Sequence, residues 1–139
     1  MATLRPEITP DSLRERQRGC LPDLLGVEVV SLESGTLTGK LTIRPELLAP
    51  NGFLHAATVI GLADTCCGYA CIAHLPDGAK NFTTVELKSN RVGTAREGVI
   101  TAKATAVHLG RSTHVWDAIV TNGEGKTIAL FRCTQMILY

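Results

Sequence analysis

The sequence predicts an α+β domain in which a curved antiparallel sheet of five to six strands wraps one long helix. Residues 56–73 are almost all apolar or small, and apolar side chains occupy every side of a helical wheel, as in a buried helix. After this segment, apolar and polar residues alternate over four stretches, which is typical of half-buried strands. Short turns rich in glycine, proline and asparagine separate these stretches. One sheet packed on one helix follows from these observations.

The residues before the long helix predict a short helix and a hairpin. Asp11 can cap a helix over residues 12–19, which ends near a glycine. Two strands are then expected, at residues 27–33 and 37–43, with a Ser-Gly-Thr turn between them. Prolines and an Asn-Gly pair mark residues 44–54 as a loop that leads into the long helix.

The residues after the long helix predict the rest of the sheet. The four expected strands cover residues 81–93, 99–111, 112–122 and 127–139. Short turns join consecutive strands, which suits an antiparallel meander. We therefore expect an N-terminal helical segment at residues 1–20 and one domain at residues 21–139. Such a sheet leaves open edges, and a symmetric dimer is the usual way to cover them.

The composition excludes several classes of protein. The net charge of +1 argues against a nucleic-acid partner, which would need a clustered basic face. The longest apolar stretch contains Asp64 and is expected to be too polar for a membrane span. Residues 1–20 lack the apolar core of a secretory signal, so we expect a cytoplasmic protein. The five cysteines are odd in number and clustered, which favours core packing over disulfides or a metal site.

The stretch PNGFLHAATVIGLADTCCGYA, residues 50–70, resembles the signature of hotdog-fold acyl-CoA thioesterases of the phenylacetate-pathway (PaaI-type) family. His55 and Asp64 have the nine-residue spacing of that family, and LADT matches as it stands. The resemblance continues through the later strands and covers about residues 21–138. It implies a hotdog fold and hydrolysis of an acyl-CoA thioester without a metal or cofactor. It also implies homodimers that assemble into a homotetramer, with active sites between subunits.

The same resemblance assigns catalytic roles. Asp64 would be the nucleophile or the general base. The backbone N–H of Ala56, at the positive end of the helix, would stabilise the oxyanion, and His55 would position this segment. The family often has Asn or Gln six residues before the histidine, where this chain has Ala49. Asn51 is the nearest amide, and it either polarises the carbonyl or serves only as the turn residue of an Asn-Gly pair.

Other residues are candidates for substrate binding. An acyl pocket is expected among residues near the helix start and on the helix: Phe53, Leu54, Thr65, Cys67, Gly68 and Cys71. Arginines and hydroxyls at strand ends suit the phosphates of CoA, because a guanidinium fork matches phosphate geometry. These candidates are Arg91, Arg111, Ser112 and Thr113, with Arg96 as a looser one.

Alternatives to this assignment stay open. Asp64 could be a structural residue that hydrogen-bonds to nearby backbone or to Thr65. The domain could bind or sense acyl-CoA without cleaving it, although binding alone does not require a buried acid. A hotdog hydratase acting on enoyl-CoA would carry its Asp and His only a few residues apart, so the spacing here favours a thioesterase. An aryl- or medium-chain acyl-CoA is the expected substrate.

Overall fold

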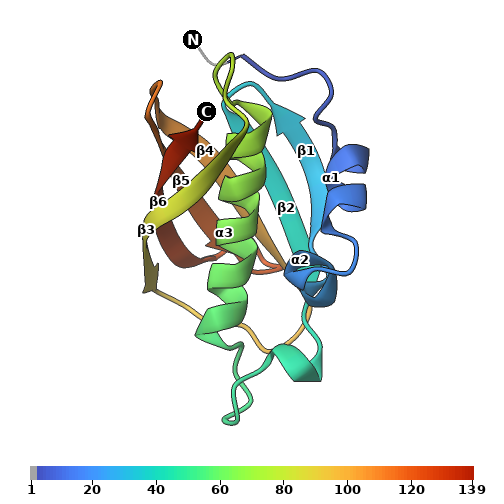
Figure 1. Cartoon of the computed structure of the whole chain (residues 1–139). Coiled ribbons are helices and arrows are strands. Elements are labelled where there is room, and N and C mark those ends of the chain that lie inside the picture. Colours follow the sequence, from blue (N-terminus) through green and yellow to red (C-terminus); the bar gives the residue numbers. More distant parts are fainter. Residues whose placement is uncertain (1–2) are drawn as a thin grey trace.

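The computed structural model describes residues 3–139 and shows a six-stranded antiparallel sheet curved around one long helix (Figure 1). This is the predicted architecture. The elements are α1 (Pro10–Gln17), α2 (Leu21–Leu25), β1 (Glu28–Glu33), β2 (Thr36–Thr42), the 3-10 helix η1 (Pro45–Leu47), α3 (Ala56–Ala73), β3 (Asn81–Arg91), β4 (Val99–Leu109), β5 (Thr113–Thr121) and β6 (Thr127–Leu138).

The strand order is β1-β2-β4-β5-β6-β3. The predicted meander is therefore correct for β4, β5 and β6 but wrong for β3, which pairs with β6 at the far edge. The chain between β3 and β4 crosses near the start of α3, where the N–H of Leu54 donates to the carbonyl of Ala95 at 2.9 Å. An alternating pattern identifies a strand and its buried face, but it does not identify the neighbouring strand.

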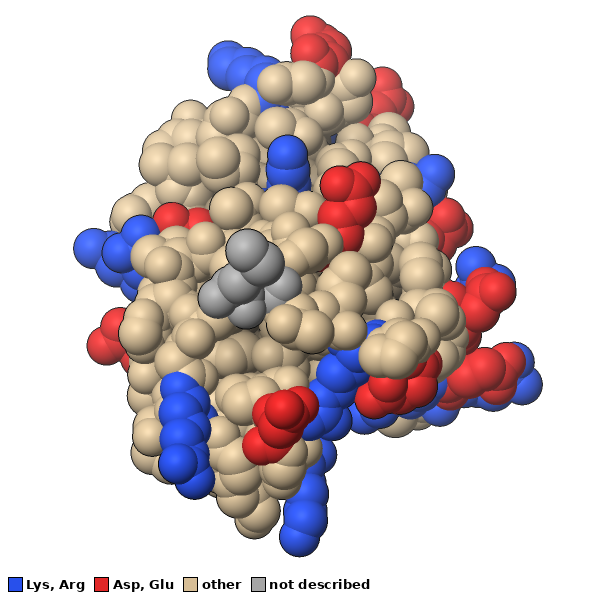
Figure 2. Space-filling view, turned by 90° about the horizontal axis from the view of Figure 1, so that it is seen from above, with Lys and Arg blue, Asp and Glu red and all other residues tan. Residues whose placement is uncertain are grey.

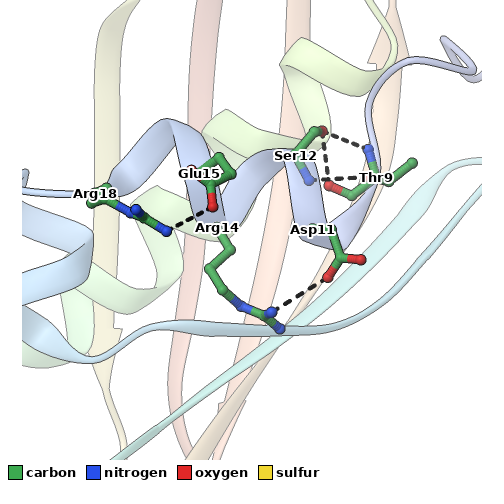
Figure 3. Close-up of polar contacts among 6 residues, drawn as sticks. All are labelled: Thr9, Asp11, Ser12, Arg14, Glu15 and Arg18. Carbon is green, nitrogen blue, oxygen red and sulfur yellow. Dashed lines mark hydrogen bonds and ion pairs between the residues drawn. The ribbon is translucent and has the colours of Figure 1, made fainter.

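The N-terminal elements differ from the prediction in two ways. Thr9, not Asp11, caps α1, because the Thr9 side chain accepts from the Ser12 N–H at 3.1 Å and the Ser12 hydroxyl accepts from the Thr9 N–H at 2.8 Å (Figure 3). The short helix α2 was not expected. Gly26 ends it in the left-handed conformation, with φ of 82°, instead of opening a strand.

The helix α3 lies in the concave face of the sheet (Figure 1). A Cβ atom on Gly39 of β2 would lie 2.6 Å from the sulfur of Cys66, so the absence of a side chain there permits the close approach of helix and sheet. Contrary to the sequence expectation, α3 has the length and the mean hydropathy, 1.5, of a membrane-spanning helix. It is 61% buried inside the fold, where it forms the core.

The core contains a buried histidine, His114 of β5, whose side chain is 1% exposed. Its Nδ1 lies 3.4 Å from the sulfur of Cys71 on α3 and accepts the indole N–H of Trp116 at 3.4 Å. Burial, with smaller contributions from His74 and His108, lowers the pKa of His114 to about 4 from the usual 6.5. The fold therefore favours the neutral imidazole.

This histidine makes stability depend on pH. Because the unfolded chain binds the proton more tightly, the free energy of unfolding is highest above pH 6.5 and falls as the pH is lowered toward 4. The loss expected from His114 alone is about 3 kcal/mol. Urea unfolding of wild type and His114→Gln at several pH values would measure it. An equal pH slope in both proteins would contradict the assignment to His114.

Candidate active site

The first turn of α3 presents a free hydrogen-bond donor. His55 is the N-cap residue, and its Nδ1 accepts the N–H of Ala57 at 2.9 Å. The N–H of Ala56 makes no hydrogen bond with any residue in the 3–139 range. This donor lies at the positive end of an apolar helix of 18 residues. Such a donor can stabilise a negative charge that develops on a carbonyl oxygen.

The loop before α3 is held by its own hydrogen bonds. The side-chain oxygen of Asn51 accepts the N–H of Phe53 at 3.1 Å, and the N–H of Ala49 donates to the Phe53 carbonyl at 2.7 Å. Gly52 completes the turn with φ of 88°. Asn51 is thus a turn residue in this structure, and its contact with a substrate carbonyl stays a prediction.

A hollow of about 490 Å³ lies beside this turn and the start of α3. It brings together six of the residues predicted from the sequence: Asn51, Phe53, Leu54, His55, Ala56 and Arg91. Ala49 and Thr94 complete its lining. Sequence reasoning missed Thr94, and no local signal identifies it, because the crossing between β3 and β4 brings it here.

Two arginines with different surroundings lie near this hollow: Arg91 lines it, and Arg96 contacts Phe53, which lines it. The guanidinium of Arg91 donates to the Leu54 carbonyl at 2.9 Å and to the Thr94 hydroxyl at 3.1 Å. The guanidinium of Arg96 stacks over the Phe53 ring, 4.0 Å from its centroid. Arg91 therefore ties the loop before α3 to the loop after β3, whereas Arg96 lies against an aromatic side chain at the edge of the hollow.

Asp64 lies further along α3, outside this hollow. It is eight residues after Ala56, which corresponds to about 12 Å along the helix axis. Its Oδ1 atom is buried and has no hydrogen-bond partner among the described residues, so Thr65 does not hold it. Burial raises the pKa of this carboxyl. Asp64 and Ala56 of the same chain are too far apart to act on one carbonyl group.

The residues around Asp64 are mostly small. Cys67 follows one helical turn later and is fully buried. At Gly68 a Cβ atom would lie 3.1 Å from the Phe82 ring of β3, so the helix and the edge strand approach closely there. One helical turn from Asp64, α3 therefore carries Ile60 and Gly61 on the N-terminal side and Cys67 and Gly68 on the C-terminal side.

Three predicted phosphate ligands lie far from the hollow, toward the C-terminal end of α3. Arg111 and Ser112 lie in the turn between β4 and β5, and Thr113 is the first residue of β5. The next residue, His114, contacts Cys71 near the C-terminal end of α3. Arg111 stacks on Tyr139, whose hydroxyl donates to the Arg111 carbonyl at 2.7 Å. Basic and acidic side chains are interspersed at this end, without a continuous field of either sign (Figure 2). A single chain does not bring these residues to the hollow.

Four of the five cysteines are buried free thiols: Cys66, Cys67, Cys71 and Cys133. Burial raises the pKa of Cys66 and of Cys71 to about 12, which keeps both protonated and unreactive near neutral pH. Within residues 3–139, no three His, Cys, Asp or Glu side chains come together as a group that could hold a metal ion.

Comparison with known proteins supplies further evidence. The sequence pattern described as the thioesterase superfamily matches residues 51–129. The chain is 30% identical to PA1618 of Pseudomonas aeruginosa, over 94% of this chain and 91% of that protein. It is 29% identical to a 1,4-dihydroxy-2-naphthoyl-CoA hydrolase of Listeria monocytogenes (82% and 92% covered) and 31% identical to the acyl-coenzyme A thioesterase PaaI of Escherichia coli (78% and 75%).

Solved structures agree with the sequence comparison. A mutant of PA1618, named there as a thioesterase, superimposes with a TM-score of 0.92 at 28% identity, over 97% of each chain. The PaaI protein of Escherichia coli superimposes with a TM-score of 0.83 over 93% of this chain and 90% of that one. The helix wrapped by its sheet is therefore the hotdog fold that the sequence predicted.

Proposed function

Because the chain belongs to the thioesterase superfamily and is a thioester hydrolase, we propose that it is an acyl-CoA thioesterase that releases a free acid and CoA from an aryl- or medium-chain acyl-CoA. The observation that carries the proposal is Asp64, a partly buried carboxylate whose Oδ1 has no partner in the described part of the chain. Desolvation costs free energy, and a structural carboxylate would recover it through hydrogen bonds. A carboxylate that must approach a substrate instead keeps an oxygen free of hydrogen bonds within the protein.

In the proposed reaction, the thioester carbonyl oxygen accepts the N–H of Ala56. This hydrogen bond strengthens as negative charge develops on the oxygen. Asp64 then either attacks the thioester carbon, forming a mixed anhydride that water hydrolyses, or takes a proton from the water that attacks. In both routes the C–S bond breaks and CoA leaves as a thiolate that is then protonated.

The two catalytic groups would come from different subunits of a homodimer. On one chain they are separated by about 12 Å along α3, which is too far for one reaction centre. The outer edge of β3 pairs with no strand of residues 3–139, and Val85, Leu87 and Val92 expose apolar side chains there. Edge-to-edge pairing of two β3 strands would cover this edge and place two α3 helices side by side.

Size-exclusion chromatography with light scattering would test this assembly. We expect the mass of two or four chains of 14.9 kDa each, in keeping with a homodimer that can form a homotetramer. A Val85→Lys substitution should weaken the dimer, because a lysine on an edge strand opposes strand addition. A monomer with full activity would contradict a site shared between subunits.

A hydrolysis assay would test the function itself. Purified protein is offered aryl-CoA and alkyl-CoA thioesters of graded length, and released thiol is measured. We expect turnover with at least one class, and a kcat/KM that distinguishes the two. Binding of several acyl-CoA compounds without release of thiol would overturn the proposal in favour of a binding domain.

A further inference from the structure

We propose that Arg96 binds the diphosphate of CoA, and that Arg91 is a positioning residue for the oxyanion segment. The inference rests on the proposed function, since it takes CoA as the leaving group. It assigns different roles to Arg91, which ends β3 and lines the hollow, and to Arg96, which lies on the loop after β3 and stacks on Phe53 of the lining. The assignment comes from the hydrogen-bond donors that each guanidinium still has free.

Each of the three nitrogens of the Arg91 guanidinium already donates one hydrogen bond to the protein, which uses three of its five N–H donors. Nη1 donates to the Leu54 carbonyl at 2.9 Å, Nη2 to the Thr94 hydroxyl at 3.1 Å and Nε to the Gly93 carbonyl at 3.4 Å. Leu54 directly precedes the N-cap residue His55, whose carbonyl accepts the first bonds of α3. Arg91 therefore fixes the segment that presents the Ala56 N–H, and it has fewer free donors for a phosphate than an arginine without hydrogen bonds.

Arg96 has the opposite arrangement. Within residues 3–139, its guanidinium makes no hydrogen bond or ion pair, and its one recorded contact is the Phe53 ring at 4.0 Å. A guanidinium that stacks by its face keeps its N–H donors in the plane, free at the edges. Stacking also restricts the side chain before binding, so less conformational entropy is lost when a phosphate arrives. Arg96 is thus a preorganised anion ligand beside Phe53, one of the residues that line the hollow.

Two other arginines, Arg44 and Arg111, are less suited than Arg96 to bind the diphosphate. Arg44 donates to the carbonyls of Leu24 and Leu25 and lies 3.6 Å from the carboxylate of Glu46. Arg111 is also stacked on an aromatic ring, that of Tyr139, but it lies at the opposite end of the fold from the hollow. The pantetheine arm separates the thioester of an acyl-CoA from its diphosphate, so the anion must lie outside the oxyanion site. Arg96, on the Phe53 side of the hollow, meets this requirement.

The experiment compares ligands and substrates with and without phosphates. Calorimetry measures binding of CoA and of pantetheine, and kinetics compare an acyl-CoA with the N-acetylcysteamine thioester of the same acid. For Arg96→Ala we expect CoA affinity to fall about tenfold or more, the loss for one charge-assisted contact. Pantetheine binding and kcat with the short thioester should be unchanged. Arg96→Lys should recover part of the CoA affinity.

Arg91→Ala should behave differently. We expect kcat to fall by similar factors with both thioesters, because the oxyanion segment is no longer held, while CoA affinity changes less than threefold or so. Arg14→Ala, which removes an exposed arginine of α1 that pairs only with Asp11 (Figure 3), is the control for net charge and should leave CoA affinity unchanged.

The outcomes separate the inference from the function. Loss of CoA affinity in Arg111→Ala or Arg91→Ala, but not in Arg96→Ala, would overturn it. So would an equal loss for CoA and pantetheine in Arg96→Ala, or no binding of CoA to the wild type. If CoA binds through Arg96 but no thioester is cleaved, the inference stands and the proposed function fails.

Discussion

The Asp64→Asn variant is expected to lose about three orders of magnitude in kcat, the middle of the range for a general acid–base group. Asparagine has nearly the same shape but can neither attack the thioester carbon nor accept a proton from water. Its thermal stability should equal or exceed that of the wild type. Burial raises the pKa of Asp64, so the ionised carboxylate destabilises the fold at neutral pH, and a neutral amide removes this cost.

The pH dependence provides an independent check on Asp64. The reaction requires the ionised carboxylate, so kcat of the wild type should fall as the pH is lowered through the raised pKa of this group. The residual activity of Asp64→Asn should lack this acidic limb, and Asp64→Glu should keep both the limb and measurable turnover. A kcat within tenfold of wild type in Asp64→Asn, or a loss of several degrees in melting temperature, would indicate a structural carboxylate instead.

The sequence is most informative where one local pattern decides the structure. The apolar helix was expected at about residues 56–73, and α3 covers Ala56–Ala73. Its N-terminal boundary is clear because His55 interrupts the apolar run and caps the helix. The late strands are also predicted close to their observed bounds because apolar and polar residues alternate in them, although bulges interrupt the alternation in β3 and β4.

Features that depend on contacts between distant residues could not be predicted. The place of β3 beside β6 is one of them, because alternation specifies which face is buried and not which strand is adjacent. The helix α2 is another, because its five residues are too few for a periodic signal, and Leu21 and Leu24 remain exposed. The sequence therefore predicted no element between the first helix and the strand at residues 27–33.

In the candidate site too, features set by local sequence were predicted and features set by long-range contacts were not. Its loop is local, so Asn51, Phe53 and His55 were found from the sequence and lie together. The different roles of Arg91 and Arg96 depend on where the crossing between β3 and β4 meets the loop before α3. In the proposed dimer, Ala56 of one chain acts together with Asp64 of the other, and only an experiment on two chains can test this relation.

Replacing Ala56 with proline is expected to lower kcat by about 10²–10³, the loss reported for one oxyanion donor, without unfolding the helix. Proline lacks the N–H, and it is favoured at the first helical position, which Ala56 occupies. The preceding residue is already suited to it, since His55 has φ of −68° and ψ of 139°. Ala56→Gly keeps the N–H and should retain near-normal turnover. An active Ala56→Pro protein would exclude this donor.

The two inactive variants together test whether the site is shared between chains. Asp64→Asn and Ala56→Pro are co-expressed with different tags, and the doubly tagged protein is purified. In each hybrid dimer, one site would combine the intact Ala56 of the first chain with the intact Asp64 of the second, and the other site would lack both groups. The purified hybrid should then show about half of wild-type activity, because one of its two sites works. Activity no higher than that of the separate variants would mean that both groups act within one chain, which the distance along α3 opposes.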